Sequence, residues 1–128
     1  MKKDNKKLNL KLLKQFPELE KKFHEEADWQ DGLDTGSIVI FEDVFKPYIY
    51  QCFDNHNEDK LKMIFQFIED LIRSDDPYEQ NVVGVALIED FALCADKLQI
   101  KKYLLPKSLK SYNESKNWKP KKDTTKIR

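Results

Sequence analysis

The feature that most restricts the fold is the spacing of apolar side chains over residues 58–73. Large apolar residues recur there at intervals of three and four positions, which places them on one face of an α-helix. Glu58 and Asp59 stand in the first turn, where negative charge is favourable to the helix dipole. The segment therefore predicts a long amphipathic helix. Its apolar residues are Leu61, Ile64, Phe65, Ile68, Leu71 and Ile72.

Two shorter helices are expected before this one, separated by Pro17. Proline breaks a helix that passes through it but suits the first turn of a new one. We therefore expect a helix that ends near Gln15 and a second from Pro17 to about Ala27. The apolar residues that support them at helical spacing are Leu12, Phe16, Leu19 and Phe23.

Residues 38–41, Ile-Val-Ile-Phe, are rich in β-branched side chains and would suit a strand. The apolar residues that follow continue at helical spacing as far as Phe53, so we expect a helix instead. Pro47 lies inside it and should bend or locally loosen it, at a cost of about 3 kcal/mol that packing has to offset.

The next helix should begin at Asp76-Pro77, a capping residue followed by a proline at the first helical position. Residues 82–88 are apolar nearly all round, which predicts the central and most buried helix. Gly84 inside it is either a weak point or a place where another helix comes close, and we expect the close approach.

A further helix is expected over residues 96–105, and after Pro106 a last turn or two to about Tyr112. The whole pattern predicts an all-α fold of five to six helices. Helices joined by short connections either close into a compact bundle or stack in a HEAT-like row, and both arrangements remain open.

The two ends of the chain are basic and the part between them is acidic. Residues 1–7 carry a net charge of +3 and residues 116–128 carry +5, although the whole chain is neutral. Residues 8–115 hold 13 basic and 21 acidic side chains, a net charge of −8. We expect a single all-helical domain over 8–115, a basic N-terminal end and a basic, disordered tail. The acidic domain should attract basic partners and repel nucleic acid.

No segment predicts export or membrane insertion. No apolar run follows the opening lysines, and the longest apolar stretches are far short of the roughly 20 residues that span a bilayer. We therefore expect a cytoplasmic protein without membrane contact. Cys52 and Cys94 lie inside apolar runs, which favours two small buried side chains over a disulfide or a redox pair.

Sequence patterns for catalysis are missing, so we expect no enzyme, no cofactor and no metal site. Glycine-rich phosphate loops and Gly-x-Ser-x-Gly do not occur. Cys52 and His56 are four residues apart, but Cys52 lies on the apolar face and His56 lies where the helix ends. Acidic pairs such as Glu69-Asp70 are expected to form solvated helix faces and caps, because the Glu-x-x-His motif of helical di-iron sites is missing.

The segment from Asp28 to Ser37 reads as a loop and carries the candidate binding residues. An exposed tryptophan among carboxylates would suit a basic protein partner, with the indole as anchor and the carboxylates steering the encounter. The alternative is that Trp29 folds back on the core and the acidic residues only keep the loop soluble. The candidate partner-binding residues are Glu25, Glu26, Asp28, Trp29, Asp31 and Asp34.

Four short motifs in the apolar helices form a recognisable set over about residues 10–112. They are Phe16-Pro17-Glu18-Leu19, Phe41-Glu42-Asp43-Val44-Phe45, Ile88-Glu89-Asp90-Phe91 and Leu104-Leu105-Pro106-Lys107-Ser108-Leu109. With these motifs the chain resembles an uncharacterised, small bacterial family of all-helical domains found among candidate toxin-immunity proteins. The resemblance implies a domain that neutralises a cognate toxin by capping its active site, and it carries over no binding residues.

Two functions therefore remain open. The first is a protein-binding module, in its most concrete form an immunity protein whose acidic surface caps a basic partner such as a toxin domain. The alternative is a regulatory protein that binds nucleic acid through the lysine-rich C-terminal tail, where Trp118 could stack on bases.

Overall fold

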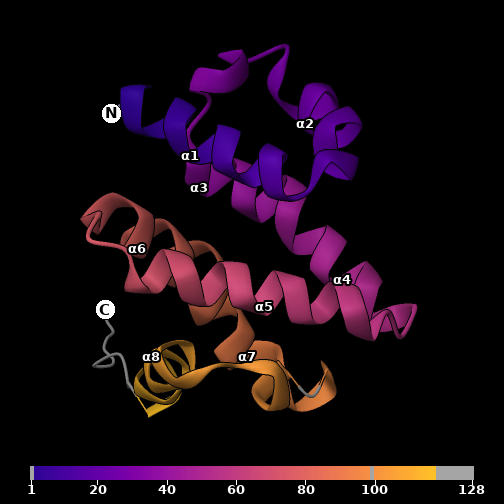
Figure 1. Cartoon of the computed structure of the whole chain (residues 1–128), viewed down its shortest axis with the longest axis vertical. Helices are drawn as coiled ribbons and strands as arrows, with labels where there is room; N and C mark the ends of the chain where they lie inside the picture. The colour runs from indigo at the N-terminus through magenta and orange to yellow at the C-terminus, as the bar shows by residue number, and fades with distance from the viewer. Residues whose placement is uncertain (1, 99, 118–128) are drawn as a thin grey trace, which may run out of the picture.

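The computed structural model describes residues 2–98 and 100–117, whose backbone is mostly helical, with no strand among them (Figure 1). A π-helical turn joins α3 to α4, and a second joins α6 to α7. With each joined pair counted as one helix, the described residues form six helices. The all-α prediction is confirmed. The elements are α1 (Lys2–Gln15), the 3₁₀ turn η1 (Pro17–Leu19), α2 (Glu20–Ala27), the 3₁₀ turn η2 (Gly32–Asp34), α3 (Ser37–Ile40), the π-helical turn η3 (Phe41–Phe45), α4 (Lys46–Asp54), α5 (Glu58–Arg73), α6 (Pro77–Val83), the π-helical turn η4 (Gly84–Ile88), α7 (Glu89–Leu98), the 3₁₀ turn η5 (Ile100–Tyr103) and α8 (Pro106–Asn117).

The β-branched residues 38–41 are helical, as their neighbours predict. α3, η3 and α4 follow one another without a break, and η3 widens the helix immediately before Pro47. Because the helix is continuous there, Pro47 is an interior residue whose missing N–H removes one main-chain hydrogen bond to the preceding turn. The expected local loosening is therefore a π-helical turn.

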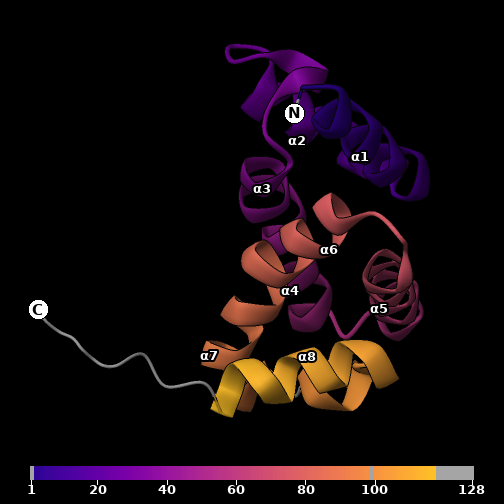
Figure 2. The ribbon, with the colours of Figure 1, turned by 90° about the vertical axis from the view of Figure 1, so that its left-hand side faces the viewer.

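The run α6–η4–α7 is the central helix of the molecule (Figure 2). It packs against α3 and η3 on one side and against α5 and α8 on the other, which closes the helices into a compact bundle. Residues 82–88 are largely buried, as predicted, apart from the exposed Val85 and the partly exposed Gly84, but α5 is buried to a similar extent. The buried apolar members of the run are Val82, Val83, Ala86, Leu87, Ile88 and Phe91.

The close approach expected at Gly84 is wrong. A methyl group placed on Gly84 would meet no atom within 4 Å. The glycine is instead the first residue of η4, with ordinary right-handed helical torsion angles. It marks an open position on the central helix, where the missing side chain serves no packing purpose.

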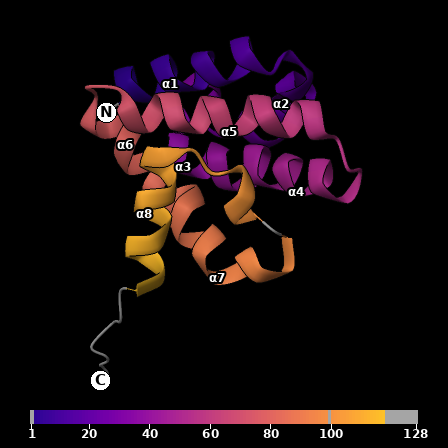
Figure 3. The same ribbon diagram turned by 60° about the horizontal axis from the view of Figure 1, so that its bottom comes forward.

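The helix expected over 96–105 is also wrong. α7 runs on to Leu98, and the chain then makes the tight turn η5, which buries Ile100. Pro106 disfavours helical torsion angles at Leu105, so a helix could not continue smoothly into the next segment. The turn lets α8 return onto α7 and α5, and α8 crosses α5 steeply (Figure 3).

Aromatic rings fill two parts of the core. Phe16, after α1, packs edge-on against Phe67 of α5 at 5.5 Å between ring centroids, and against Phe45 at 5.4 Å. Phe65 of α5 stacks on Tyr103 at 5.7 Å and contacts Phe91 at 5.8 Å. α5 therefore joins both ring clusters, which accounts for its strongly apolar face.

No helix in the described part of the chain is both long enough and apolar enough to cross a membrane.

Candidate partner-binding loop

Residues 28–36, called the Trp29 loop below, connect α2 to α3 at the end of the molecule opposite α8 (Figure 1). The loop leaves α2 through a bond from the Asp28 N–H to the carbonyl of His24. Gly32 then takes a φ of +59°, the left-handed region in which glycine is favoured. This turn reverses the chain and leads into η2.

Asn9 of α1 holds the far side of the loop. Its amide nitrogen donates to the carbonyls of Leu33, at 3.0 Å, and Thr35, at 2.8 Å. Its amide oxygen accepts from the Ser37 hydroxyl at 3.0 Å. Asn9, Thr35 and Ser37 are all buried, so these bonds form away from competing water.

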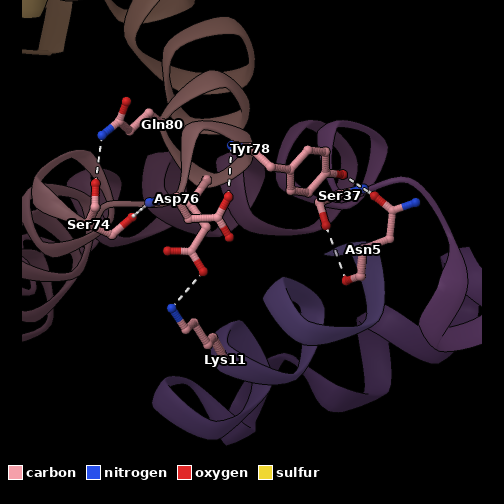
Figure 4. Close-up of polar contacts among 8 residues, drawn as sticks. Asn5, Lys11, Ser37, Ser74, Asp76, Tyr78 and Gln80 are labelled. Carbon is pink, nitrogen blue, oxygen red and sulfur yellow. Dashed lines mark hydrogen bonds and ion pairs between the residues drawn. The ribbon is translucent and has the colours of Figure 1, made fainter. Parts of the chain in front are cut away.

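Asn5, one helical turn earlier, extends this clamp to the central helix (Figure 4). Its amide oxygen accepts from the Ser37 N–H at 3.2 Å and from the hydroxyl of Tyr78 in α6. Its amide nitrogen lies 3.4 Å from the carbonyl oxygen of Asp34. The Trp29 loop is therefore fixed to α1 and, through Asn5, to α6.

The sequence analysis missed both asparagines, although a signal was present. Asn5 and Asn9 are four residues apart and alternate with Leu8 and Leu12 on one helical face. All four side chains are buried. Polar amides on an apolar face need hydrogen-bond partners when they are buried, and a nearby loop is a ready source of them.

The candidate binding residues lie together on the last turns of α2 and in the loop. Trp29 is 75% exposed, so the side chain points into solvent and does not fold back on the core. Glu25, Asp28 and Asp31 are exposed, whereas Glu26 and Asp34 are partly buried. Three of the candidate carboxylates and the indole are therefore exposed within the same short segment of chain.

Two of these carboxylates already have charged neighbours. The His24 Nδ1 atom lies 2.9 Å from Asp28 Oδ1, and its Nε2 atom lies 3.8 Å from Glu20 Oε1. The hydrogen bond with Asp28 raises the pKa of His24 above its ordinary value. Lys22 lies 3.8 Å from Glu26. Glu25 and Asp31 take part in none of the ion pairs formed within the described ranges.

Two buried carboxylates lie away from the loop. Glu79 of α6 binds Lys11 of α1 at 2.6 Å, and its second oxygen, Oε1, has no hydrogen-bond partner within the part of the chain described. Glu69 of α5 accepts hydrogen bonds from the first turn of α8. Both hold helices together and neither opens to the surface.

The cysteine and histidine side chains form no shared site in the described structure. Cys52 is buried, and this burial raises the pKa of its thiol. His56 is exposed at the end of α4, with a φ of 53°. Among the side chains that the structure describes, no group of three or more His, Cys, Asp and Glu could hold a metal ion. The side chain of Cys94, and Trp118 with most of the basic tail, lie outside the described part.

A family model described as "Domain of unknown function (DUF7674)" matches residues 9–119. No curated protein and no solved structure matches the chain.

Proposed function

This chain belongs to the DUF7674 family of domains of unknown function, and we propose that it is a protein-binding module whose Trp29 loop docks on a basic partner. The observation that carries the proposal is the 75% exposure of Trp29 on a loop held by buried hydrogen bonds. Tryptophan is a common anchor of protein interfaces because its large ring gains much from burial.

The clamp supports the proposal for an energetic reason. Binding through a loop normally costs the conformational entropy that the loop loses on ordering. Here Asn5 and Asn9 order the loop before any partner arrives, so most of that cost falls on folding. An exposed indole in a fixed position can then contribute most of its burial energy to association.

The charge of the surface indicates the chemistry of the partner. Glu25, Asp28 and Asp31 are exposed around the indole, and residues 8–115 together carry a net charge of −8. Such a surface steers a cationic partner toward itself and accelerates association at low ionic strength. In its concrete form the proposal is an immunity protein of bacterial type that caps the phosphate-binding cleft of a basic toxin, such as a nuclease.

The test is binding of the purified products of neighbouring genes, measured by biolayer interferometry at 50 and 500 mM salt. We expect one basic protein to bind, with weaker binding at high salt because the loop charges are screened. Trp29→Ala should weaken it at least about 30-fold, the loss typical of an interface anchor.

Two exposed residues elsewhere provide matched controls. Leu93→Ala removes an exposed apolar side chain of α7, and Glu89→Gln removes an exposed carboxylate of the same helix. Neither should change the affinity. Binding that is equally weakened by Leu93→Ala and Trp29→Ala, or that survives Trp29→Ala intact, would contradict the proposal.

A further inference from the structure

One histidine, His24, lies next to the proposed binding surface. His24 of α2 lies four residues after Glu20 of the same helix and four before Asp28, the first residue of the Trp29 loop, and its ring contacts both carboxylates, at 3.8 and 2.9 Å. The imidazole is about half exposed, so it exchanges protons freely with solvent. Asp28 is the residue before Trp29, so the ring is hydrogen-bonded to the chain neighbour of the indole anchor.

The charged groups that contact His24 belong to α2 and to its C-cap residue, Asp28. The elements packed against α2 are η1, η2, α3 and η3, and their charged residues are Glu18, Asp34, Glu42 and Asp43. Within the described ranges, none of these four forms an ion pair with His24. Glu20 and Asp28 therefore decide whether the ring is protonated, and both favour the charged form.

We infer that His24 is a pH-sensitive regulator of the Trp29 loop, and that protonation of its ring weakens the binding of a basic partner. The inference rests on the proposed function. A protonated imidazole cancels one negative charge next to the anchor and engages Asp28 in an ion pair. The deprotonated ring leaves the full charge of Asp28 to attract the partner. The hydrogen bond with Asp28 raises the pKa of His24 above its ordinary value, so the contact favours the protonated ring.

The experiment uses the full chain and a tetramethylrhodamine-labelled nona-arginine peptide, whose charge is constant between pH 6 and 8. Fluorescence anisotropy at 50 mM salt gives the affinity of the protein for the peptide at pH 6 and at pH 8. We expect the affinity to be about two- to fivefold weaker at pH 6, the effect of one unit charge a few ångströms from the site in water.

Variants assign the effect to one residue. His24→Gln should bind equally at pH 6 and pH 8, because glutamine does not titrate. The matched control is His56→Asn at the only other histidine, where asparagine tolerates the left-handed backbone; it should retain the pH dependence.

The outcomes separate this inference from the proposed function. Binding at pH 8 that disappears in Trp29→Ala but has the same strength at pH 6 would overturn only the inference. A pH dependence that persists in His24→Gln would overturn it as well. Failure of the peptide to bind at either pH, or binding that Trp29→Ala leaves unchanged, would contradict both proposals.

Discussion

Glu69 of α5 accepts two hydrogen bonds from Ser108 of α8, from the backbone N–H at 2.9 Å and from the hydroxyl at 2.7 Å. Its other carboxylate oxygen accepts from the Lys107 N–H at 3.0 Å and from Arg73 at 2.7 Å. The carboxylate is 2% exposed. A residue of α5 therefore does for α8 what a helix's own capping residue usually does.

We expect Glu69→Gln to lower the free energy of unfolding by about 1–3 kcal/mol, because the neutral amide makes weaker bonds and one of its ends cannot accept. Urea denaturation measures the loss. The matched control is Asp70→Asn at the exposed neighbouring position, which should stay within about 0.5 kcal/mol of the wild type. Equal effects of the two changes would show that the cap does not stabilise α8.

Glu69 should also affect how strongly the stability of the folded protein falls at acidic pH. Burial acts to raise the pKa of Glu69, but its hydrogen bonds with Ser108, Lys107 and Arg73 outweigh burial and hold the pKa below the ordinary value of 4.5. A depressed carboxylate pKa stabilises the folded state above pH 4.5, and this contribution disappears as the pH falls through the folded value. Melting temperatures between pH 3 and 7 should therefore fall more steeply below pH 4.5 in the wild type than in Glu69→Gln.

Removal of one partner of the Lys11–Glu79 pair should destabilise the fold, whereas replacement of both partners by apolar side chains should not. Lys11→Met leaves a buried carboxylate without its cation, and we expect a loss of about 2 kcal/mol or more. The double variant Lys11→Met/Glu79→Met removes both charges and should recover most of that loss. Lys14→Met, on an exposed position of the same helix, should have little effect. A double variant less stable than Lys11→Met would mean that the pair itself stabilises the fold.

Two glycines should respond in opposite directions to alanine. Gly84 has helical torsion angles and open space around it, so Gly84→Ala should raise the free energy of unfolding by about 0.5–1 kcal/mol. Gly32 has a φ of +59°, so Gly32→Ala should lower the free energy of unfolding by about 1–2 kcal/mol. Thermal denaturation of both variants tests the pair, and a destabilised Gly84→Ala would reinstate the close approach that the sequence predicts.

The loop clamp should depend on Asn9. Asn9→Ala leaves the carbonyls of Leu33 and Thr35 without their donor, and we expect a loss of about 2 kcal/mol or more in global stability. Amide hydrogen exchange of residues 30–35 should also become faster. Asn81→Ala, an exposed helical position, is the control and should be neutral or slightly stabilising. Unchanged exchange in Asn9→Ala would show that the loop is ordered by other contacts.

Helices with a regular apolar face were predictable from the sequence. α5 begins at Glu58, as its charged first turn suggested, and helical spacing correctly outweighed the β-branched character of residues 38–41. The end of the chain was less predictable because its structure depends on distant residues. α8 reaches Asn117, well beyond the expected Tyr112, and the acceptor for its first turn comes from Glu69, 39 residues before Ser108.

The composition of the sequence predicted the Trp29 loop, but it did not predict the hydrogen bonds that hold the loop. Turn-forming residues and two glycines identify the segment, and the acidic residues around Trp29 are adjacent in sequence. The position of the loop backbone depends on where α1 lies, because Asn9 bonds to the carbonyls of Leu33 and Thr35 across 24 and 26 residues of chain. Side-chain hydrogen bonds over that separation leave no periodic pattern.

The clamp also bears on how far the folded unit extends toward the N-terminus. The family match begins at residue 9, but Asn5 and the fully buried Leu8 precede it. A protein shortened to residue 9 would keep every candidate contact residue, yet it would lose Asn5, which links the Trp29 loop to Tyr78. Such a shortened protein would be a poor choice for measuring affinity, because of the two asparagines only Asn9 would still hold the loop.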